Sequence, residues 1–159
     1  MTHKILVLDI DGTLTNSKKE VTPATKAALT KLQEAGGIVA IASGRPTAGT
    51  AKIAEECDLA KYGGYIISYN GARIVRWDSK EVLYNNNLPQ QYIPQIFEIA
   101  KERGVGMISY DPDDNLITGT ATDKYMELEE SQLSQTESLC ILYPSLHLML
   151  ILHILHKEL

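Results

Sequence analysis

The sequence predicts an α/β fold built on a parallel sheet, followed by a smaller α+β part. Apolar runs alternate with helical patterns at first, an Asn-Gly pair at residues 70 and 71 indicates a hairpin, and the alternation stops there. Strand–helix–strand units of this length form parallel sheets with right-handed crossovers. We therefore expect a core over residues 1–80, a partial α+β domain over 81–130 and an atypical apolar tail over 131–159.

The first strand is expected at residues 5–8, an apolar run rich in branched side chains. Such a run is typical of a strand that is buried on both faces of a parallel sheet. It ends in Asp9 and Asp11, which precede Gly12 and Thr13. Because side chains alternate along an extended chain, the two carboxylates point the same way. Their repulsion requires a nearby cation or proton, which indicates a functional site.

Helix and strand signals then follow in order. Thr22-Pro23 is an N-cap followed by proline in the first helical position, and Gly36-Gly37 ends that helix. Apolar residues 38–42 predict the second strand, residues 47–57 a helix and residues 65–69 the third strand.

The second half has a different pattern. The turn at Asn70-Gly71 predicts that 65–69 and 72–77 pair as antiparallel strands, and 82–84 can add another. A helix is expected to begin at Pro89 and to end at Gly104. The segments 105–110 and 116–118 then predict a hairpin. The acidic residues between them, 111–115, resemble a calcium loop only in composition, and Pro112 favours a turn.

Composition excludes several classes of protein. The chain has 159 residues, 44% of them hydrophobic and 22% charged, as in ordinary globular domains. A net charge of −5 argues against nucleic-acid binding. Two cysteines, Cys57 and Cys140, and a start without a signal-peptide pattern predict a reducing, cytoplasmic location. Residues 139–155 lack Asp, Glu, Lys and Arg, but Pro144 and the missing basic flank argue against a membrane span.

A second polar cluster follows the second strand. Ser43-Gly44-Arg45 supplies a hydroxyl, free amides and a cation where the strand leads into a helix, which is typical of a phosphate-binding corner. An EF-hand calcium loop beginning at Asp9 is excluded because Leu14 stands where that loop needs glycine. A simple capped turn and a sugar-nucleotide transferase clamp remain as alternatives for the acid pair, but neither explains the second cluster.

Residues 5–15 and 41–46 resemble the first and second motifs of the haloacid dehalogenase superfamily. Residues 66–72, Ile-Ile-Ser-Tyr-Asn-Gly-Ala, make the Cof-type sugar-phosphatase branch the nearer resemblance. The likeness runs from about residue 4 to about residue 129. It implies a Rossmann-like core, an α+β cap inserted after the third strand, and Mg²⁺-dependent hydrolysis of a small phosphorylated metabolite, with sugar phosphates as the expected substrates.

The resemblance also implies roles for individual residues. Asp9 would be the nucleophile and a magnesium ligand, and Asp11 would be the general acid/base that also gives its carbonyl oxygen to the metal. The remaining implied positions bind the phosphoryl group or line the substrate pocket: Ile10, Gly12, Ser43, Gly44, Arg45 and Asn70.

The sequence also departs from the family pattern. The family places a phosphate-binding lysine and a later acidic motif beyond the cap. Neither has a match after Glu130 in this sequence, and the residues around Lys157 do not resemble the family's lysine motif. We therefore expect this chain alone to bind Mg²⁺ weakly and to hydrolyse esters slowly or not at all. The alternative function is a non-catalytic remnant that binds phosphate or a partner. Self-association through an exposed sheet edge or the apolar tail is also expected.

Three histidines near the end of the chain are further candidates for metal ligands. They are His147, His153 and His156, and no acid or cysteine accompanies them. We interpret them as packed or surface side chains.

Overall fold

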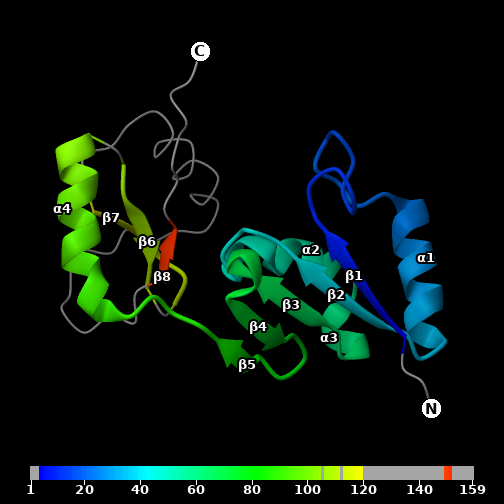
Figure 1. Ribbon diagram of the computed structural model, residues 1–159. Helices are drawn as coiled ribbons and strands as arrows, with labels where there is room; N and C mark the ends of the chain where they lie inside the picture. Colours follow the sequence, from blue (N-terminus) through cyan, green and yellow to red (C-terminus); the bar gives the residue numbers. More distant parts are fainter. Residues whose placement is uncertain (1–3, 105, 112, 120–148, 152–159) are drawn as a thin grey trace. The chain divides into compact units, whose positions relative to one another are not determined.

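A five-stranded sheet organises the first half of the chain (Figure 1). The computed structural model describes residues 4–104, 106–111, 113–119 and 149–151. The chain divides into two units, Met1–Asn86 and Asn87–Leu159, and each is described by itself.

The sheet has a parallel part and an antiparallel part. Strands β1 (Ile5–Asp9), β2 (Ile38–Ala42) and β3 (Tyr65–Ser68) are parallel, and β4 (Arg73–Arg76) and β5 (Glu81–Asn85) extend them as antiparallel strands. The strand order is β1-β2-β3-β4-β5. This arrangement confirms the predicted α/β fold with a parallel sheet and places the ends of β1 and β2 next to each other.

Helix α1 (Pro23–Glu34) joins β1 to β2 and begins as the sequence predicts. The Oγ1 atom of Thr22 accepts a hydrogen bond from the amide of Thr25 at 3.2 Å, which satisfies one free donor of the first turn. At the other end, Gly36 has φ +82°, and the amide of Gly37 donates to a carbonyl of the last turn at 2.9 Å. Both predicted helix signals are confirmed.

The predicted helix over residues 47–57 is shorter and less regular than expected. It consists of a 3-10 turn, η1 (Ala48–Thr50), followed by α2 (Ala51–Glu56), and the short helix α3 (Leu59–Tyr62) comes after it. Asp58 lies between α2 and α3 with φ +54°, a left-handed conformation that ends a right-handed helix.

The hairpin predicted at Asn70-Gly71 is present: β3 and β4 pair as antiparallel strands from Tyr65↔Arg76 to Ser68↔Arg73. The connection is a 3-10 turn, η2 (Tyr69–Gly71), rather than the tight two-residue loop of the sequence prediction. Its three residues all have positive φ, between 53° and 93°. Strand β5 then pairs with β4, so residues 81–85, which the sequence assigned to the second part, lie in the sheet of the first unit.

The hydrophobic core of the first unit lies on one face of this sheet. Val39, Ile41 and Ile66 supply the sheet side, and each is fully buried. Leu29 of α1 and Ile53 of α2 belong to the same buried cluster. These positions follow the helix and strand periodicities on which the sequence prediction rests.

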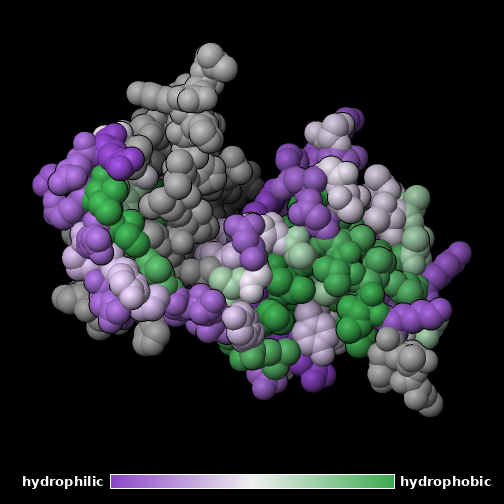
Figure 2. Space-filling view, in the orientation of Figure 1, coloured by the Kyte–Doolittle hydropathy of each residue, from purple (hydrophilic) through white to green (hydrophobic). Residues whose placement is uncertain are grey.

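The edge of this sheet formed by β1 is exposed among the described residues. The side chains of Ile5 and Val7 are 61% and 52% exposed, and β1 is an edge strand. The prediction that β1 is buried on both faces was therefore wrong, because no described element pairs with its free edge or covers these side chains. Figure 2 shows hydrophobic side chains gathered over the strands of the first unit.

The second unit contains helix α4 and a three-stranded antiparallel sheet. The turn η3 (Gln90–Tyr92) leads into α4 (Ile93–Arg103), and Gly104 ends it with φ +61°. Strands β6 (Ile108–Tyr110), β7 (Leu116–Thr118) and β8 (Met149–Ile151) follow, in the order β7-β6-β8. The predicted hairpin of β6 and β7 is confirmed.

The acidic segment between β6 and β7 forms a turn. The Asp111 carboxylate accepts hydrogen bonds from the amides of Asp113 and Asn115 at 2.9 and 2.8 Å. Its oxygens therefore hold the turn itself, as the sequence interpretation expects. Among the described residues, no helix is long and apolar enough to cross a membrane.

Candidate active site

The loop after β1 is anchored so that its carboxylates remain exposed. Ile10 and Leu14 are buried in the core, at 1% and 3% exposure. The amide of Leu14 donates to the Asp9 carbonyl at 3.1 Å, and both the amide and the Oγ1 of Thr15 donate to the Ile10 carbonyl at 2.9 Å. Asp9 and Asp11, which flank Ile10, are exposed. The turn thus fixes the backbone of both carboxylates without covering them.

In Gly12 and Ile10, the backbone is the part of the residue that a ligand could contact. Gly12 has φ +78°, a conformation that side chains with a Cβ adopt at a cost, and open space surrounds the position where its Cβ would lie. Ile10 uses its side chain in the core, so only its peptide group can contact a ligand. We therefore expect any ligand contact at these two predicted phosphate-binding positions to come from the backbone.

The corner after β2 brings the other predicted residues together. The amide of Arg45 donates to Ser43 Oγ at 3.2 Å, and the amide of Asn70 donates to the Ser43 carbonyl at 3.1 Å. A Cβ at Gly44 would lie 3.0 Å from Asn70 Oδ1. Residues from the ends of β2 and β3 thus form one polar corner. The register pairs Asp9 with Ala42, the residue before Ser43.

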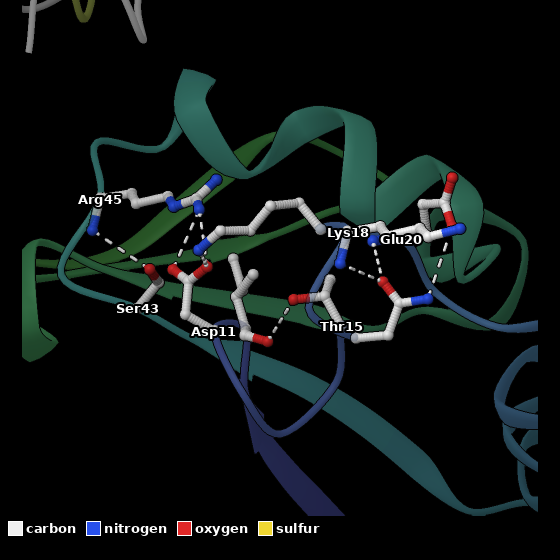
Figure 3. Close-up of polar contacts among 9 residues, drawn as sticks. Asp11, Thr15, Lys18, Glu20, Ser43 and Arg45 are labelled. Atoms are coloured by element: carbon white, nitrogen blue, oxygen red, sulfur yellow. Dashed lines mark hydrogen bonds and ion pairs between the residues drawn. The ribbon is translucent and has the colours of Figure 1, made fainter. Parts of the chain in front are cut away.

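Arg45 connects this corner to the β1 loop (Figure 3). Its Nη2 atom donates to both carboxylate oxygens of Asp11, at 3.1 Å to Oδ1 and 2.9 Å to Oδ2. The side chains are 36% and 42% exposed, so the ion pair is open to solvent. Four of the eight predicted site residues, Asp11, Arg45, Ser43 and Asn70, therefore belong to one hydrogen-bonded network. Asp9, Ile10 and Gly12 lie in the same loop as Asp11, and Gly44 lies between Ser43 and Arg45.

A second cation at this site was missed by the sequence analysis. Lys19 Nζ donates to Asp11 Oδ1 at 2.5 Å and forms an ion pair with it. The sequence analysis assigns no role to residues 16–19, and nothing in the sequence pattern distinguishes Lys19 from Lys18. Only the path of the loop selects Lys19, so no sequence signal could have identified it.

These contacts determine the charge state of Asp11. The hydrogen bond from Lys19 lowers the pKa of the Asp11 carboxyl most strongly, partial desolvation opposes it, and the Arg45 guanidinium lowers the pKa further. Asp11 is therefore ionised near neutral pH.

Asp9 is the group best placed to hold a metal. Its carboxylate is exposed and has no hydrogen bond or ion pair with another described residue. Mg²⁺ prefers oxygen ligands, keeps several waters, and is commonly bound by one or two carboxylates together with substrate phosphate. The Asp9 carboxylate and the Asp11 carbonyl fit that requirement. No group of three or more His, Cys, Asp or Glu side chains suited to a metal occurs within the described ranges. The three candidate histidines lie outside them.

Comparison with known proteins identifies relatives of this chain. Residues 6–145 match the family model of the haloacid dehalogenase-like hydrolases. A crystal structure of a haloacid dehalogenase-like hydrolase from Bacteroides thetaiotaomicron has 39% sequence identity and a TM-score of 0.74 over 84% of this chain and 50% of that one. The sugar phosphatase BT4131, of subclass IIB, has 25% identity and a TM-score of 0.62, covering 79% of this chain and 46% of that one.

Curated relatives agree with these structures. YxeH of Bacillus subtilis (strain 168) is 29% identical over 133 residues, which are 84% of this chain and 49% of YxeH. A phosphoglycolate phosphatase of Methanospirillum hungatei is 30% identical over 107 residues, 66% of this chain and 45% of the relative. The chain thus spans about half the length of the curated relatives it matches.

Proposed function

The chain belongs to the haloacid dehalogenase-like hydrolase family, and we propose that it acts as a phosphatase on small phosphate esters. The observation that carries this proposal is the corner of Ser43, Arg45 and Asn70 beside the Asp9–Asp11 loop. The corner supplies a hydroxyl, an amide side chain and a guanidinium for a phosphate, and the loop supplies a nucleophile and a proton-transfer group.

In the proposed reaction, a carboxylate oxygen of Asp9 attacks phosphorus and the ester P–O bond breaks. The leaving oxygen takes a proton from Asp11, and Asp9 carries the phosphoryl group as an acyl phosphate. Asp11 then accepts a proton from a water that attacks phosphorus, which releases inorganic phosphate and restores the Asp9 carboxylate and the protonated Asp11. Mg²⁺, held by Asp9 and the Asp11 carbonyl, would offset the negative charge that accumulates there.

Proton donation requires that Asp11 be protonated for part of the cycle, whereas its contacts with Lys19 and Arg45 favour the ionised form. Those contacts therefore have to loosen when a phosphate ester binds. The anion itself supplies the means, because it competes with Asp11 for both cations.

Small phosphorylated metabolites are the proposed substrates. The names of three relatives describe phosphatases of phosphoglycolate, pyridoxal phosphate and a sugar phosphate. We retain sugar phosphates as the first substrates to test. The second unit, from Asn87 onward, is the proposed cap, and the cytoplasm is the proposed location.

A second candidate function is phosphate binding without turnover. It is favoured by one observation, that the described residues offer fewer than three side-chain ligands for a metal in any one place. We therefore expect slow turnover by this chain alone. Self-association through the open edge of β1 is proposed as well, since Ile5 and Val7 are exposed apolar side chains on a strand whose outer edge has no partner among the described residues.

A panel of phosphate esters with and without Mg²⁺ distinguishes the two functions. A phosphatase releases phosphate in a Mg²⁺-dependent way, and Asp9→Asn abolishes the release because an amide cannot act as the nucleophile. Binding of inorganic phosphate without any release above the Asp9→Asn background would support the non-catalytic function instead.

A further inference from the structure

Lys19 is placed at the candidate site by a loop that is closed on itself. The Asn16 Oδ1 atom accepts hydrogen bonds from the amides of Lys18 and Glu20, at 2.9 and 3.1 Å. The backbone of Asn16 pairs with that of Glu20 at 3.0 Å, and the Lys19 amide donates to the Asn16 carbonyl at 2.9 Å. Figure 3 shows this turn beside Asp11. The loop therefore determines which of the two neighbouring lysines reaches the carboxylate.

The backbone of Lys19 has an unusual conformation. Its φ is +62°, in the left-handed region that side chains other than glycine and asparagine adopt infrequently. In this conformation the Lys19 side chain returns to Asp11, whereas the Lys18 side chain forms no hydrogen bond or ion pair with another described residue. The two lysines thus differ in position while sharing the same charge and the same loop.

The charge balance of the site explains why a second cation is useful there. Asp9 and Asp11 carry two negative charges, and Lys19 and Arg45 carry two positive charges, so the ligand-free cluster is neutral. A phosphate ester adds between one and two further negative charges near neutral pH. With the ester bound the cluster is therefore negative even with both cations, and losing Lys19 would add one more uncompensated negative charge, in a chain whose net charge is already −5.

The contact of Lys19 with Asp11 is suited to exchange. The Lys19 side chain is 68% exposed and Asp11 is 42% exposed, and ion pairs this open to water are weak. A phosphate dianion presents more charge and more acceptor oxygens than one carboxylate, so it competes effectively for the same ammonium group.

From these observations we propose that Lys19 is a phosphate-binding residue of this site, resting on Asp11 without ligand and transferring to the substrate anion when it binds. This inference rests on the proposed function.

Inorganic phosphate is the probe for the test, titrated into the full chain by calorimetry with and without Mg²⁺. Lys19→Gln should weaken phosphate binding about three- to tenfold, because one charge-assisted contact at an exposed site is lost. Lys19→Arg should restore affinity to within about twofold, because it keeps the charge. Lys18→Gln is the matched control, because it removes one positive charge from the same loop, and its affinity should stay near that of the wild type.

Equal phosphate affinities for Lys19→Gln and Lys18→Gln would overturn the inference, as would a wild-type chain that does not bind phosphate. Circular dichroism of each variant verifies that the fold is retained. The proposed function can fail separately. If phosphate binding depends on Lys19 but no ester is hydrolysed, the inference about Lys19 is supported and the proposed phosphatase function is contradicted. If hydrolysis depends on Asp9 but Lys19→Gln binds phosphate as the wild type does, the phosphatase function is supported and the inference about Lys19 is contradicted.

Discussion

The guanidinium of Arg45 lies against the carboxylate of Asp11, with Nη2 3.1 Å from Oδ1 and 2.9 Å from Oδ2. This contact joins the loop after β1 to the corner after β2, two segments that are 34 positions apart in the chain. It brings the candidate acid/base and the candidate phosphate corner into one site, which neither segment forms alone.

Replacing Arg45 with methionine should raise the pKa of Asp11 toward its ordinary value of 3.8, because one of the cations that favour the carboxylate is lost. A group whose pKa is lowered by folding stabilises the fold above its unfolded pKa, and this stabilisation is lost as pH falls through the folded pKa. The acid-induced loss of stability should therefore be smaller in Arg45→Met. An NMR titration of the Asp11 side-chain carbon measures the shift directly. Arg76→Met, which breaks a separate pair with Asp78, is the control.

Gly44→Ala should weaken substrate binding without unfolding the chain. A Cβ at Gly44 would lie 3.0 Å from Asn70 Oδ1, so the Asn70 side chain has to move within the phosphate corner. We expect KM for a phosphate ester, or the Kd for inorganic phosphate, to rise several-fold. Gly49→Ala is the matched control, because its Cβ would meet Arg45 and Pro46 at 3.5 and 3.6 Å, which are ordinary contacts. Equal constants for the two variants would show that Asn70 is not needed in that position.

Gly64→Ala should destabilise the fold. A Cβ there would lie 2.8 Å from the Val39 carbonyl oxygen and 3.1 Å from Leu59 Cβ, and a backbone atom cannot easily move away. Overpacking of this kind lowers the free energy of unfolding by about 1–3 kcal/mol. Urea unfolding, again compared with Gly49→Ala, measures the difference. A variant as stable as the control would mean that β2 and α3 are less closely packed than described.

The Cys57 thiol should make stability depend on pH in the alkaline range. Burial, with a smaller contribution from Glu56, raises its pKa from 9.0 to about 11. Because the folded state favours the neutral thiol, its contribution is complete below pH 9 and is lost as pH rises toward 11. The stability difference between wild type and Cys57→Ala should therefore shrink over that interval in urea unfolding curves. A constant difference would indicate that water reaches the thiol.

The sequence predicted those features that depend on local chemistry. The Thr22 cap, the Gly36 helix end and the β3–β4 hairpin each depend on residues close together in the chain, so their signals can be recognised without the fold. The Ser43 corner could be anticipated because both acid pair and corner follow strands of a parallel sheet.

The features that the sequence analysis missed depend on the path of the chain in space. An apolar run such as β1 is typical of a doubly buried strand, but burial depends on elements elsewhere, and Ile5 and Val7 are exposed in the described structure. Lys19 was missed for a related reason. Its backbone conformation directs it toward Asp11, and no spacing rule separates it from Lys18.

Trapping of a phosphorylated Asp9 tests the central claim most directly. The chain is incubated with a reactive phosphoryl donor and Mg²⁺, quenched in acid, and digested for mass spectrometry. We expect one phosphoryl group on the peptide that contains Asp9, and none in Asp9→Asn, even if turnover is slow. An unmodified wild-type peptide, or equal modification of both proteins, would contradict the assignment of Asp9 as the nucleophile of a phosphatase.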